Sequence, residues 1–126
     1  MKRLWAGRRV DVVAKGVAVR TPDVEAAVKF LTAQDGGRQT PVATGYRGDV
    51  FYRGQDHVTV HEFVGTQVVE PGSEVTVLMR FLHPELLYAH FRDGEEFEVR
   101  EGSRTVARGK VTRVVDLVQH GLVAKS

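Results

Sequence analysis

The chain has 126 residues, with 18 Lys and Arg against 16 Asp and Glu, and it contains no cysteine. A single domain of this length buries enough surface to fold without disulfides or metals, and the missing cysteines exclude a disulfide scaffold, a thiolate zinc site and a cysteine nucleophile. The net charge of +2 is too small to indicate nucleic-acid binding by itself.

Residues 1–20 precede the first regular strand pattern. Residues 1–9 are basic, but no apolar segment of signal-peptide type follows them, and no window approaches the length of a membrane span. We therefore expect a soluble intracellular protein whose folded part begins near residue 21.

Alternating apolar residues and frequent turn glycines then predict an all-β domain over residues 21–116. The alternation is regular from Val24 to Phe30, and the turn signals include Asp35-Gly36-Gly37 and Glu70-Pro71-Gly72-Ser73. Further strands are expected at 42–53 with a break near 48–49, at 58–64, at 75–82, at 96–100 and at 105–115. Short strands at regular spacing are typical of a closed or nearly closed barrel.

Two segments do not follow the strand pattern. Residues 84–90 begin with a proline, which ends a strand ladder, and they are expected to form a loop or a single helical turn. Residues 117–126 form a tail, for which the pattern allows a short extra strand or disorder.

No enzyme motif is present. Gly102 to Lys110 ends in Gly-Lys, but six residues separate its glycines where a phosphate-binding loop needs four, and Val111 replaces the Ser or Thr that would bind magnesium. His57 and His61 lie four apart, a spacing that brings two ligands together on a helix but about 13 Å apart on a strand. We interpret them as surface histidines and expect no catalytic residue, no cofactor and no metal.

A collinear series of short motifs resembles the C-terminal β-barrel, domain III, of elongation factor Tu, whereas nothing resembles the GTPase domain of that factor. The series runs from Thr21 to Val115, and it is specific because the gaps between its members match. Its members are Gly36-Gly37-Arg38, Thr40-Pro41, Gly45-Tyr46-Arg47, Phe51-Tyr52-Arg53, Asp56, Pro71-Gly72, His83-Pro84, Arg100-Glu101-Gly102, Arg104-Thr105-Val106 and Gly109.

The resemblance implies a cytoplasmic, six-stranded, antiparallel, closed β-barrel. It further implies that residues 1–20 are similar to the linker that follows domain II in the family. It also implies that the barrel contacts tRNA, a translation GTPase or an exchange factor. Carried over by position, the tRNA-facing residues would be Asp49, Thr59, His83, Glu101 and Gly102. The family pattern Gly-Tyr-Arg-Pro becomes Gly-Tyr-Arg-Gly here, which we expect to loosen the bend at residue 48.

Four arginines in the motif loops, Arg38, Arg47, Arg53 and Arg104, complete the candidate nucleic-acid-binding set. Two interpretations are open for them: direct contact with a ligand, or ion pairs with acids such as Glu101 that fix the loops. The neighbouring aromatics Tyr46, Phe51 and Tyr52 are expected to pack between strands and not to stack on bases.

These observations favour a non-enzymatic binding module related to domain III of elongation factor Tu, which contacts tRNA or a translation protein. The alternative is a protein–protein interaction or homodimerisation module without an RNA role. No nucleotide of its own and no membrane contact are expected in either case.

Overall fold

The computed structural model describes residues 20–126, and the prediction for the first 20 residues therefore lies almost wholly outside the described part. The elements in chain order are β1 (Val24–Phe30), β2 (Val42–Ala43), β3 (Asp49–Tyr52), β4 (Gln55–His57), β5 (Thr59–Val64), β6 (Val68–Val69), β7 (Glu74–Phe81), the 3₁₀ turn η1 (Pro84–Leu86), β8 (Glu96–Glu101), β9 (Arg104–Val114) and the helix α2 (Leu117–Lys125).

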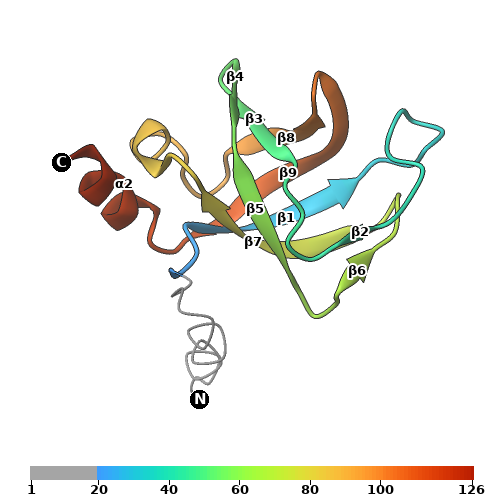
Figure 1. Cartoon of the computed structure of the whole chain (residues 1–126), viewed down its shortest axis with the longest axis horizontal. Helices are drawn as coiled ribbons and strands as arrows, with labels where there is room; N and C mark the ends of the chain where they lie inside the picture. The colour runs from blue at the N-terminus through green and yellow to red at the C-terminus, as the bar shows by residue number, and fades with distance from the viewer. Residues whose placement is uncertain (1–19) are drawn as a thin grey trace.

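Seven of the strands form one antiparallel sheet in the order β4-β3-β8-β9-β1-β7-β5, and β2 pairs separately with β6. The sheet curves into a half-barrel, as Figure 1 shows. The predicted all-β class is confirmed.

Six strands and a sealed barrel are not confirmed. The sheet has a seventh strand because residues 55–57 pair with β3 as β4, whereas residues 59–64 pair with β7 as β5. One continuous stretch of chain thus passes from one edge of the sheet to the other. An isolated antiparallel β-bridge joins Tyr46, just before β3, to His61 in the edge strand β5.

The core lies on the concave face of the sheet and follows the predicted alternation. Val24, Ala26 and Val28 of β1 are fully buried. Every second residue of β7, and Phe97 and Val99 of β8, are buried as well. Aromatic side chains fill the space between strands, with Phe91 in edge contact with Tyr52 and Phe81. Burial of these alternating apolar residues on the concave face is the main contribution to the stability of the fold.

Residues 117–125 of the expected tail form the helix α2, so the expected extra strand or disorder is wrong for this segment. Leu117 is fully buried, and Gly121 lies against the Tyr88 ring near η1. Figure 1 shows α2 beside η1, at the end of the sheet opposite the β8–β9 turn. Within the described residues, no helix has the length and apolarity to cross a membrane.

Candidate nucleic-acid interface

The predicted site residues divide between the two ends of the sheet. The antiparallel pairing places the end of β8, the start of β9 and the start of β3 at one end. We call this the rim, and it carries six of the nine predicted residues: Arg38, Arg47, Asp49, Glu101, Gly102 and Arg104. The other end, which we call the η1 end, carries Arg53, Thr59 and His83. One compact ligand therefore cannot touch all nine.

Glu101 organises the rim. Its carboxylate accepts a hydrogen bond from the Tyr46 hydroxyl at 2.5 Å and an ion-pairing hydrogen bond from Arg38, and its other oxygen lies 3.7 Å from Arg104. Burial alone would raise the pKa of this carboxyl, but the hydrogen bonds from Tyr46 and Arg38 outweigh it and the pKa of Glu101 is lowered. Glu101 is thus an anion that fixes the cations around it.

Arg38 is held from several sides, while its neighbours on the rim are free to reach a ligand. Its guanidinium also donates to the Thr40 hydroxyl at 2.9 Å and lies over the Tyr46 ring. Arg104 has a side chain that is 55% exposed, and Arg47 is exposed and forms no ion pair within residues 20–126. Arg38 is therefore fixed by its ion pair, whereas the exposed Arg47 and the mostly exposed Arg104, 3.7 Å from Glu101, can also reach a ligand.

The β8–β9 turn has the geometry that its sequence predicts. Glu101 pairs with Arg104, so Gly102 and Ser103 form a two-residue turn, and Gly102 has a φ of +62°. A positive φ at the first turn residue suits the right-handed twist of a hairpin and favours glycine. Both turn residues, Gly102 and Ser103, are exposed.

Asp49 lies at the rim, at the start of β3 and opposite Arg100. Partial burial and the nearby Asp56 carboxylate raise the pKa of Asp49. A carboxylate at this position disfavours a contact with phosphate.

Of the three predicted site residues at the η1 end, Thr59 is buried, whereas Arg53 and His83 are exposed. Thr59 is fully buried, and its hydroxyl donates to the His57 carbonyl at 2.7 Å, so it is not presented to a ligand. His83 is exposed, with Nδ1 3.2 Å from Glu85. Arg53 occupies the β3–β4 turn at a φ of +51°, where it lies over the Tyr52 ring.

The two histidines that were interpreted as surface residues are buried. His57 is 6% exposed and His61 is 0% exposed, and burial lowers the pKa of both imidazoles. The signal for the burial of His61 is the alternation in β5, since His61 shares the inward face with Thr59 and Phe63. Within the described residues, no group of three or more His, Asp or Glu is placed to hold a metal ion.

The three motif aromatics pack as expected. Tyr52 is buried and donates to Glu95 at 2.5 Å, and Phe51 lies under the Arg100 guanidinium at 3.4 Å. Tyr46 contacts Phe30 edge-on and is the link between the core and Glu101.

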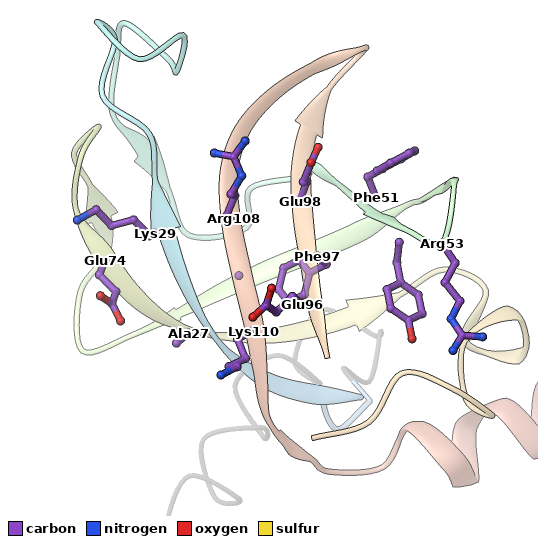
Figure 2. Close-up of a pocket in the computed structure, with 12 residues that line it drawn as sticks. Ala27, Lys29, Phe51, Arg53, Glu74, Glu96, Phe97, Glu98, Arg108 and Lys110 are labelled. Atoms are coloured by element: carbon purple, nitrogen blue, oxygen red, sulfur yellow. The ribbon is translucent and has the colours of Figure 1, made fainter. Parts of the chain in front are cut away.

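A groove of about 600 Å³ crosses the outer face of the sheet. Figure 2 shows Lys29 and Glu74 at one side of it and Arg53 at the other, with Arg108 and Glu98 on neighbouring strands between them. The strand register sets cations opposite acids, Lys29 opposite Glu74 and Arg108 opposite Glu98. Because the charges alternate, this groove does not select a negatively charged ligand.

The fold and the rim define a β-sheet binding domain that exposes cationic loops at one end. The family model of the elongation factor Tu C-terminal domain matches residues 17–115. The chain belongs to this family, and it is a binding module related to a translation factor. The helix α2 lies beyond the matched residues.

Proposed function

We propose that the chain is a non-enzymatic module that binds tRNA through the rim, with Arg47 and Arg104 contacting phosphates and the β8–β9 turn contacting sugars. The observation that carries the proposal is that Arg38, Arg47 and Arg104 lie at the same end of the sheet, where Arg38 and Arg104 flank Glu101. Guanidinium groups and exposed turn amides are the donors that contact phosphate and the 2′-hydroxyl. Membership of the family supports a translation-related partner.

The surface is small, so we expect weak and salt-dependent binding. A few phosphate contacts give dissociation constants in the range of about 10⁻⁴ to 10⁻⁶ M at physiological salt. The rim carries the cations Arg38, Arg47 and Arg104 against the carboxylates Asp49 and Glu101, which leaves only a small positive excess.

Titration of fluorescently labelled tRNA at low and moderate salt tests the proposal. The double variant Arg47→Ala/Arg104→Ala should weaken binding by about tenfold or more, and each lost phosphate contact should lower the salt slope by about 1. Its matched control is Arg92→Ala/Arg113→Ala, which removes the same charge from exposed residues outside the rim; Arg113 is 57% exposed and ion-paired once, as Arg104 is. Equal loss in both double variants, or no tRNA binding at low salt, would refute the rim as the RNA surface.

A second function is favoured by an apolar patch at the η1 end. Val58, Leu82 and Leu86 are 42%, 62% and 61% exposed, and the Leu82 amide donates to the Val58 carbonyl, so two of the three are adjacent. Exposed apolar groups of this kind mark protein partners or a homodimer. Light scattering over a hundredfold range of concentration should show association that Leu82→Asp abolishes, and a strict monomer would exclude the homodimer.

A further inference from the structure

His61 is a polar residue at a position that an apolar residue would fill more favourably. It lies in β5 with its ring in the interior and is fully buried. Its Nε2 lies 2.7 Å from the Gly48 carbonyl oxygen, an acceptor that requires the proton on Nε2. Its Nδ1 has no hydrogen-bond partner within the described residues. A buried, unpartnered nitrogen costs stability, so the bond to Gly48 is the feature that explains a histidine here.

Residues 45–48, just before β3, contact β5 mainly through His61. The Gly45 amide donates to the His61 carbonyl at 2.8 Å, and the His61 amide donates to the Tyr46 carbonyl at 2.8 Å. The His61 ring also lies against the Tyr46 ring, with centroids 5.3 Å apart. His61 therefore holds residues 45–48 in three ways: through two backbone hydrogen bonds, through Nε2 and through the contact of its ring with Tyr46.

Tyr46 connects His61 to the rim. Its hydroxyl donates to Glu101, which in turn holds Arg38 and Arg104. The ring has little freedom on its other side, because a Cβ at position 48 would lie 2.6 Å from Tyr46 Cε2. A displacement of Gly48 or of the Tyr46 backbone would therefore move the anion that spaces the rim cations.

We propose that His61 is the positioning residue of the rim: it fixes Gly48 and Tyr46, and through them the arrangement of Arg38 and Arg104 around Glu101. The inference rests on the proposed RNA-binding function and adds to it a buried residue that never touches the ligand.

Protonation of His61 should release this arrangement. The titratable group that faces the ring is Tyr46, with Glu101 and Arg38 beyond its hydroxyl, and the β7 residue opposite is Met79. No carboxylate within residues 20–126 contacts the ring to balance a positive charge, and burial lowers the pKa of His61 to about 4. The ring is thus neutral at pH 7, and acidification places a charge in the interior next to Tyr46.

The test compares three variants by amide hydrogen exchange and by tRNA titration. His61→Leu removes the donor to Gly48 and should lower the protection factor of the Gly45 amide at least tenfold relative to amides of β1, and weaken tRNA binding at least fivefold. His61→Gln retains a side-chain donor and should restore most of both properties. His120→Gln is the control, because it replaces a largely buried histidine on α2, at the end of the sheet away from the rim.

A pH series separates positioning from simple packing. Between pH 6 and 4 the wild-type Gly45 amide should lose protection before the β1 amides, and His61→Gln should not show this early loss. The inference is overturned if His61→Leu keeps Gly45 protection and tRNA affinity within twofold of wild type, or, should that variant not fold, if wild type and His61→Gln respond equally to acid. If no variant binds tRNA, the proposed function fails while the exchange measurements still decide the role of His61.

Discussion

Gly48 shows how a departure from the family motif is explained by one close contact. The family proline at this position led to the expectation of a looser bend, but Gly48 is buried between the Tyr46 ring and Val99. A Cβ there would lie 2.6 Å from the ring and 2.7 Å from the Val99 methyl group. The glycine is therefore required by tight packing.

Gly48→Ala should lower the free energy of unfolding by about 1–3 kcal/mol, because overpacking forces side chains off their rotamers. Urea denaturation measures this loss. In a Tyr46→Leu background most of the clashing atoms are gone, and the cost of Gly48→Ala should fall by at least half. The same cost in both backgrounds would show that the ring is not the constraint.

His61 also makes stability depend on pH. Its folded pKa of about 4 is below the ordinary value of 6.5, so protons favour the unfolded chain. The stabilisation is fully present above pH 6.5 and is lost as the pH falls toward 4, by about 3 kcal/mol in total. Denaturation midpoints at pH 7.5, 5.5 and 4 should fall more steeply for wild type than for His61→Gln. Parallel curves would mean that His61 does not titrate in this range.

At the scale of elements, α2 is fixed to the start of β1 by a buried carboxylate. Asp23 is fully buried; Oδ1 lies 2.6 Å from His120 Nδ1, and Oδ2 accepts from Arg20 and from the Phe81 amide, each at 2.7 Å. Thr21 donates to Asp116, just before the helix, at 2.5 Å. These contacts join α2 to the edge of the sheet and make the helix part of the folded domain.

His120→Ala should destabilise the domain by about 1–3 kcal/mol, because one oxygen of a buried carboxylate loses its side-chain partner. Gln119→Ala, on the exposed side of the same helix, is the control and should stay within about 0.5 kcal/mol of wild type. Thermal unfolding followed by circular dichroism measures both. Equal effects would indicate that α2 is held by its apolar contacts alone.

The strands were predictable from the sequence, and the helix was not. The alternation at 24–30 and 75–82 is regular because each strand has one buried and one exposed face. In residues 117–125 only Leu117 and Gly121 are buried, so the apolar pattern is too weak to indicate a helix. What fixes the segment is Asp23, almost a hundred positions earlier, and such a long-range contact leaves no local signal.

At the scale of the whole molecule, the motifs identified the family but not the layout of the site. The collinear series correctly indicated the elongation factor Tu C-terminal domain. It could not show that residues 55–64 cross from one sheet edge to the other, since alternation does not reveal which strand pairs with which. For the same reason Thr59 and His83 were grouped with Glu101, although the antiparallel pairing places them at the other end.

The division of the molecule into a rim and an η1 end is most directly tested by mapping amide chemical shifts of the labelled protein during titration with tRNA at low salt. The shift changes should be concentrated at residues 38–49 and 101–104 and should be absent from residues 53–54 and 83–86. Changes centred on residues 53–54 and 83–86, or no change at the rim at saturating tRNA, would contradict an RNA surface built on Arg47, Glu101 and Arg104.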